Sequence, residues 1–187
     1  MNIDRIKHEI ARLKQSPSTY DSTEGIGIVR FIVRCPFGAA KVLDNAKYIL
    51  MIVANNSFGD WPDDSEWNRL LPKWFVDACA PSPSQEEAER WLKMWKCLSP
   101  HEQAEAEIKR DWSLDNWLYW MKPENRQWIW WDGEVVPYSD HVIVAVEVDC
   151  WPFPWGALRW LFKVCGASEV TADFFKDKSS LGVISYA

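Results

Sequence analysis

Residues 141–166, HVIVAVEVDCWPFPWGALRWLFKVCG, constrain the fold of this chain more than any other stretch. Valine occupies every second position over 142–148, and a period of two places all four side chains on one face of a strand. Pro152 and Pro154 then impose a corner, because proline fixes its own φ angle and keeps the preceding residue extended. Apolar residues recur at helical spacing over 155–165. With the strand-like SEVTADFF that follows, the stretch predicts a β-α-β unit.

The first two-thirds of the chain carry helix signals. The stretch 39–55 contains a run, 48–53, that could by itself be a buried strand, although its full length favours one helix. Serines in capping positions precede several of the apolar runs. The predicted helices cover 3–15, 39–55, 66–79 with a bend at Pro72, and three short segments that begin after Ser84, Ser99 and Ser113.

The sheet signals lie mostly in the last third. Residues 25–34 and 126–136 are rich in β-branched and aromatic residues, and Asp132-Gly133 predicts a tight turn within the second of these stretches. A polar loop is expected at 16–24, and 180–186 is compatible with a further edge strand. The predicted fold class is therefore α+β, with Trp-rich helices packed on a mainly antiparallel sheet that ends in the β-α-β unit. We expect a single domain over 1–187, helical to about 122 and sheet-rich from about 123.

The net charge and the cysteine content limit the classes of partner and cofactor that we expect. The formal net charge is −6, which disfavours nucleic acid and anionic membranes because both require clustered Lys and Arg. Five cysteines are widely spaced, without the short pairs of a zinc site, so we expect reduced thiols and no metal. The first residues lack the apolar core of a signal peptide. These features predict a soluble cytoplasmic protein without cofactors.

Catalytic motifs are not found in the sequence. The three histidines lie on different predicted elements, which suits surface hydrogen bonding better than base catalysis. The best catalytic candidates are Glu147 and Asp149, which share the second face of the 141–149 strand about 7 Å apart. Two carboxylates at this separation can hold a metal or act as acid and base. An enzyme or small-ligand protein that uses this alternative ligand site is therefore one hypothesis.

A short acidic segment, 60–67, is the best candidate for binding a partner. Four acids stand between two tryptophans, and we interpret the acids as the start of a helix capped by Ser65. Tryptophan is enriched among the residues that anchor protein interfaces, so the two rings are candidate anchors. The segment predicts a surface for a basic protein partner, formed by Asp60, Trp61, Asp63, Asp64, Glu66 and Trp67.

In its size, its acidity and its lack of a catalytic motif, the chain resembles immunity proteins of bacterial contact-dependent and other polymorphic toxin systems. The stretch 136–162, VPYSDHVIVAVEVDCWPFPWGALRWLF, is also similar to stretches of uncharacterised bacterial proteins. The first resemblance implies a non-catalytic protein that neutralises a toxin by covering its basic active site. A structural subunit that assembles with copies of itself through exposed tryptophans is a second alternative to this function.

Overall fold

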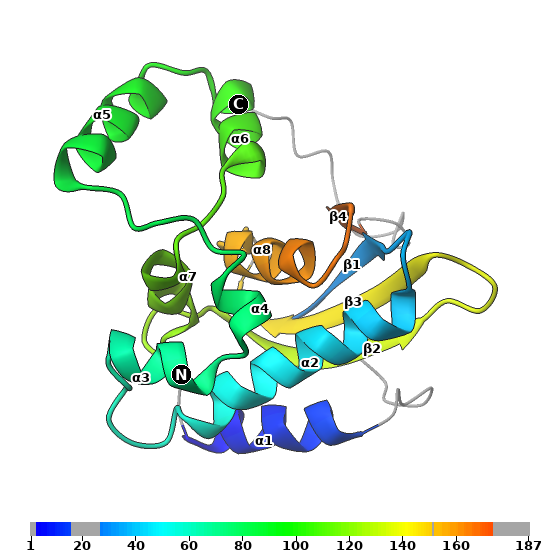
Figure 1. Ribbon diagram of the computed structural model, residues 1–187. Coiled ribbons are helices and arrows are strands. Elements are labelled where there is room, and N and C mark those ends of the chain that lie inside the picture. Colours follow the sequence, from blue (N-terminus) through cyan, green and yellow to red (C-terminus); the bar gives the residue numbers. More distant parts are fainter. Residues whose placement is uncertain (1–2, 16–26, 151, 174–187) are drawn as a thin grey trace.

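The computed structural model describes residues 3–15, 27–150 and 152–173, so the loop expected at 16–24 and the edge strand at 180–186 lie outside it. The described strands form one sheet in the order β2-β3-β1-β4, and each neighbouring pair is antiparallel (Figure 1). The α+β class is confirmed. The strands are β1 Ile28–Arg34, β2 Trp128–Val135, β3 His141–Val148 and β4 Glu169–Ala172.

Strand β3 lies at the centre of the sheet, as its valines indicate. It pairs with β1 from His141, opposite Arg34, to Glu147, opposite Ile28. Its even-numbered valines are all buried, whereas Ile143 on the other face is exposed. One face of the strand is therefore fully packed and the other is partly open, which is the pattern the sequence predicts.

The C-terminal β-α-β unit is present. Its two strands are not neighbours, because β1 lies between them, and the sequence did not reveal this. Strands β3 and β4 are both antiparallel to β1, so they run in the same direction with β1 between them. The connection runs through helix α8, Gly156–Val164, which is buried over most of its length. Gly166 ends this helix region with a positive φ of 109°, a conformation that glycine adopts without steric cost.

Apart from α8, the described helices all precede strands β2, β3 and β4 along the chain. Helix α2 is one continuous helix, so residues 48–53 are not a strand. The prediction of one continuous helix over 66–79 is wrong. Two helices form instead, because Pro72 lacks an N–H and is the N-cap of the second helix. The helices are α1 Ile3–Lys14, α2 Ala39–Asn55, α3 Asp64–Leu70, α4 Lys73–Val76, α5 Gln85–Lys96, α6 Pro100–Lys109 and α7 Leu114–Met121.

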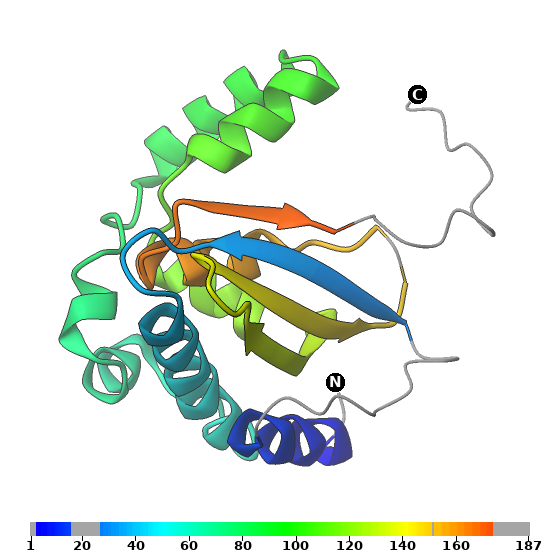
Figure 2. The same cartoon turned by 90° about the vertical axis from the view of Figure 1, so that its right-hand side faces the viewer.

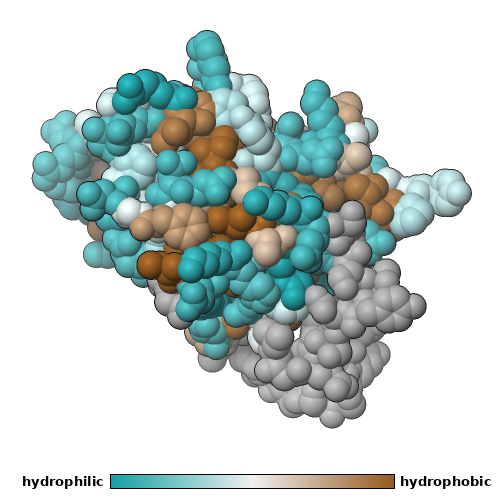
Figure 3. All heavy atoms as spheres, turned by 90° about the horizontal axis from the view of Figure 1, so that it is seen from below, coloured by the Kyte–Doolittle hydropathy of each residue, from teal (hydrophilic) through white to brown (hydrophobic). Residues whose placement is uncertain are grey.

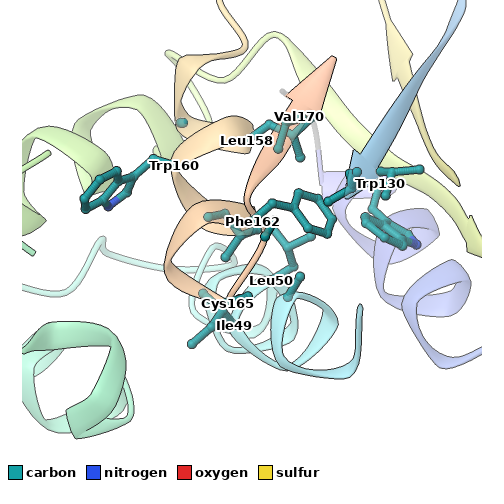
Figure 4. Close-up of a cluster of buried hydrophobic side chains, with 14 of the residues drawn as sticks. Ile49, Leu50, Trp130, Leu158, Trp160, Phe162, Cys165 and Val170 are labelled. Atoms are coloured by element: carbon teal, nitrogen blue, oxygen red, sulfur yellow. The ribbon is translucent and has the colours of Figure 1, made fainter. Parts of the chain in front are cut away.

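The core lies between the sheet and the helices that cover one of its faces. Figure 2 shows α2 and α8 on the same side of the strands, and α1 beside α2. Leu50 of α2, Phe162 of α8 and Trp130 of β2 are fully buried in this interior (Figure 4). Burial of one large ring removes about 150–250 Å² from water. Each buried ring therefore contributes more hydrophobic stabilisation than a single aliphatic side chain, and the fully buried tryptophans are Trp67, Trp117, Trp128 and Trp130.

The prediction of a turn at Asp132-Gly133 is wrong. Strand β2 runs through both residues, and the pairing with β3 shifts by one residue between Trp130 and Asp132. This irregularity is a β-bulge. A Cβ atom added to Gly133 would lie 2.5 Å from Cζ2 of Trp130 and 2.8 Å from Cδ1 of Leu43. Glycine is needed here to let a buried indole lie against the backbone, and the chain reverses later, between β2 and β3.

We expect Gly133→Ala to lower the free energy of unfolding by about 1–3 kcal/mol, because the new methyl group overpacks a closed interior. Gly59→Ala is the matched control, since a Cβ atom at Gly59 meets nothing within 4 Å. Urea unfolding of the two variants measures the difference. Equal stability of both variants would contradict the close packing of Trp130 on the backbone of β2.

Helices α5 and α6 form an arm that projects away from the sheet (Figure 1). No residue of α5 is buried. Each helix of the arm begins with its own capping box, Ser84 with Glu87 and Ser99 with Glu102. Local capping thus defines these helices where burial does not.

Candidate functional site

The acidic segment follows α2 and leads into α3. All four of its acids, Asp60, Asp63, Asp64 and Glu66, are exposed. They lie within seven consecutive residues, and the apolar side chains of Phe58 and Leu70 on either side are also exposed, at 41% and 39%. The segment therefore presents clustered negative charge with apolar surface at its two ends.

Hydrogen bonds within the segment fix two of its carboxylates. Oδ1 of Asp63 accepts from the backbone N–H of Glu66 at 2.9 Å and from the Ser65 hydroxyl at 2.7 Å. The Glu66 carboxylate accepts from the backbone N–H of Asp63 at 3.2 Å, which completes a capping box. The Ser65 hydroxyl and the Glu66 N–H lower the pKa of Asp63, because they stabilise its charged form. The prediction that Ser65 caps the helix is wrong: Asp63 is the N-cap.

The two tryptophans of the segment have different positions. Trp67 is fully buried in the core, and the half-buried ring of Trp61 packs on it with 4.8 Å between ring centroids. Trp67 is therefore not available as a surface anchor, contrary to the expectation from sequence. Its burial instead attaches the exposed carboxylates to the interior of the domain.

The alternative site at the end of β3 is occupied by an arginine of α1. Nη1 of Arg5 lies 3.0 Å from both carboxylate oxygens of Asp149, and its Nη2 lies 3.2 Å from Oε1 of Glu147. Both carboxylates thus share one guanidinium. The structure brings this pair together as the sequence predicts, but it places a cation between them. His141 lies at the opposite end of β3 and does not join them.

A cluster of Ser139, Asp140 and His141 was missed by the sequence reasoning, although the three residues are consecutive. The Ser139 hydroxyl lies 2.7 Å and the Asp140 carboxylate 2.9 Å from the same nitrogen, Nδ1 of His141. A hydrolytic triad needs the hydroxyl and the carboxylate on opposite ring nitrogens. The side chain of Arg34 binds Asp140 at 3.2 Å and lowers its pKa. This cluster closes the β2–β3 turn and does not form a proton relay.

An open pocket of about 430 Å³ lies beside this turn, at the start of α2. Phe37 and Tyr138 are almost fully exposed next to it, and Tyr138 has a φ of 57°, which is strained for a residue with a side chain. Cys35 lines the pocket, and burial raises its pKa to about 11, so its thiol is a poor nucleophile. Among the described residues, no group of three or more His, Cys, Asp and Glu is placed to hold a metal.

Comparisons with protein-family models, with curated proteins and with solved structures find no match to this chain. None of the described helices combines the length and the apolar character that a bilayer crossing requires. Function must therefore be inferred from the surfaces of this chain alone.

Proposed function

We propose that the protein is a non-catalytic binding protein of the immunity type, which neutralises a toxin by covering its basic active site. The observation that carries the proposal is the acidic segment. Its four exposed carboxylates lie on a short loop and helix start, and two kinds of contact fix the geometry of this segment. Internal capping holds Asp63 and Glu66, and the buried ring of Trp67 holds the backbone beneath them.

A fixed acidic surface suits this function on physical grounds. Clustered carboxylates attract a cationic cleft over several ångströms and accelerate the encounter of the two proteins. Because the segment is ordered before binding, little conformational entropy is lost when the complex forms. The exposed side chain of Phe58 adds apolar contact area just after the end of α2. Apolar atoms are visible among hydrophilic ones on the face that contains α1 and α2 (Figure 3).

The strand-end carboxylates support the competing enzymatic function less well. The guanidinium of Arg5 neutralises much of the charge that Glu147 and Asp149 would offer to a metal or a substrate. At Asp140 and His141, the geometry does not provide a base for a nucleophile. A binding role therefore accounts for more of the charged surface than a catalytic role.

The test is a variant that removes the four charges but keeps the caps: Asp60→Asn, Asp63→Asn, Asp64→Asn and Glu66→Gln. Asn caps a helix as well as Asp does, and Gln can replace Glu in a capping box. The protein is co-expressed with the product of the gene immediately upstream, and the purified pair is compared at low and moderate salt. We expect the variant to associate at least about 10-fold more slowly at low salt and to lose rescue of cells from toxicity.

The matched control neutralises four exposed acids elsewhere, with Asp77→Asn, Glu124→Gln, Glu134→Gln and Glu169→Gln. It makes the net charge less negative by the same amount, so an effect confined to the first variant locates the interface. Unchanged affinity and rescue in the first variant would overturn the role of the acidic segment. Failure of the native pair to copurify and to rescue cells would overturn the proposed function itself.

A further inference from the structure

Helix α5 has an apolar surface that is too wide for its single neighbour. With a rotation of about 100° per residue, its apolar side chains span an arc of about 160°. A stripe that one helix covers is narrower than this. The arc is bounded by Met94 on one side and Leu92 on the other, with Trp91 and Trp95 between them and Ala88 on the Leu92 side.

Helix α6 covers only the middle of this arc. Trp91 and Trp95 are half-buried and stacked, with 6.1 Å between ring centroids, and the Gln103 amide of α6 donates to the backbone carbonyl of Trp95 at 3.1 Å. The edges of the arc stay open, since Leu92 is 44% and Met94 50% exposed. Among the described residues of the arm, these two side chains leave an apolar surface on each side of α6.

The base of the arm is held in place. The backbone N–H of Ala80 donates to the carbonyl of Trp112 at 3.0 Å, so the two chain segments that enter and leave the arm are joined. The Ser82 hydroxyl also donates to Asp115 at 2.7 Å. The arm nevertheless stands clear of the sheet in both views (Figures 1 and 2), so another molecule can approach α5.

The charges of α5 indicate what that molecule is. Acids lie in the first half of the helix, at Glu86, Glu87 and Glu89, and bases lie in the second half, at Arg90, Lys93 and Lys96. Two copies of such a helix that pack antiparallel place each acidic half beside a basic half. The α5 surface is therefore complementary to itself about a two-fold axis.

We propose that the α5–α6 arms of two copies of this chain pack together into a four-helix bundle, with α5 antiparallel to its counterpart. Paired arms cover Leu92, at one edge of the arc, with the apolar surface of the second arm, and they place Glu89 of one copy beside Lys96 of the other. The interface is separate from the acidic segment, so each copy of the dimer keeps that segment exposed. The inference stands independently of the proposed function.

The first experiment measures the mass of the full chain in solution by light scattering after size-exclusion chromatography. We expect a species of twice the 21.8 kDa of one chain at micromolar concentration. Leu92→Glu should give a monomer with an unchanged circular dichroism spectrum, whereas Met94→Glu, at the opposite edge of the arc, should remain dimeric. Phe37→Glu alters an apolar side chain that is 92% exposed elsewhere, and it should remain dimeric. A native chain that is monomeric at several hundred micromolar would overturn the proposal.

The second experiment tests the antiparallel arrangement. Glu86→Lys with Glu89→Lys leaves Glu87 as the only acid of α5, whereas Lys93→Glu with Lys96→Glu leaves Arg90 as its only base. Both variants spare the capping box of Ser84 and Glu87. Each variant alone should be monomeric, and an equimolar mixture should give a heterodimer. Persistent homodimers of either variant would overturn the arrangement, and the four-acid neutral variant of the 60–66 segment should leave the mass unchanged.

Discussion

Replacing Glu9 with Ala is expected to lower the free energy of unfolding by about 3–5 kcal/mol, because it leaves a buried guanidinium without its counter-charge. Glu9 and Arg126 are both buried, and their side chains form a two-point ion pair. Glu9 also accepts the backbone N–H of Trp130 at 2.7 Å, and Arg126 lies 4.0 Å over the ring of Trp128. These contacts join α1 to β2 beside the β-bulge. Urea unfolding followed by circular dichroism measures the loss.

A variant without both charges separates the contribution of the ion pair from the cost of one unpaired buried charge. Glu9→Met with Arg126→Met removes both charges and keeps apolar volume, so it should lose less stability than Glu9→Ala alone. In this double variant the backbone N–H of Trp130 has lost its acceptor, so the free energy of unfolding should still fall by about 1–3 kcal/mol. A loss below about 1 kcal/mol for Glu9→Ala would mean that the pair behaves as a surface ion pair, in contradiction to its burial.

Replacing Trp117 with Ala is expected to lower the free energy of unfolding by about 3–5 kcal/mol. Its ring is fully buried, with 4.8 Å between its centroid and that of Phe75, and its Nε1–H donates to the carbonyl of Ala157 at 3.0 Å. The substitution therefore opens a large cavity and leaves the carbonyl of α8 without this donor. Thermal and urea unfolding both report the change.

The matched control for this cavity is Trp74→Ala. Trp74 also packs against Phe75, but it is 40% exposed, so its removal should lower the free energy of unfolding by only about 1–2 kcal/mol. Trp117→Phe should retain much of the stability, because an apolar ring still fills the space. Similar losses for Trp74→Ala and Trp117→Ala would contradict the assignment of α7 to the core.

Local patterns predicted those elements whose signal lies within a few residues. The alternating valines of β3 and the serine caps of α5 and α6 needed no information from the rest of the chain, because side-chain period and capping are local properties. Asp132-Gly133 was misread for the same reason. An Asp-Gly pair between apolar runs signals a turn, and only the pairing of these two residues with Ala145 and Val144 of β3 makes them part of a strand.

In the candidate site, too, the sequence predicted local features but not contacts between distant segments. The sequence indicated that the four acids of 60–66 would be exposed, since clustered carboxylates are rarely buried without partners. It could not show that Trp67 is buried, because exposure of a tryptophan depends on which elements pack around it. The pairing of Arg5 with Glu147 and Asp149 could not be predicted from the sequence either, because more than 140 residues separate these positions along the chain.

The sequence by itself determined the α+β class, the course of β3 and α8, the starts of the arm helices, and the acidity of the 60–66 segment. Each depends on spacing, capping or charge over short distances. Only the tertiary structure decided that β1 lies between β3 and β4, that Glu9 meets Arg126 in the interior, and that the acids rest on a buried tryptophan. These outcomes depend on contacts between distant segments, whose free energies arise only when the whole core closes.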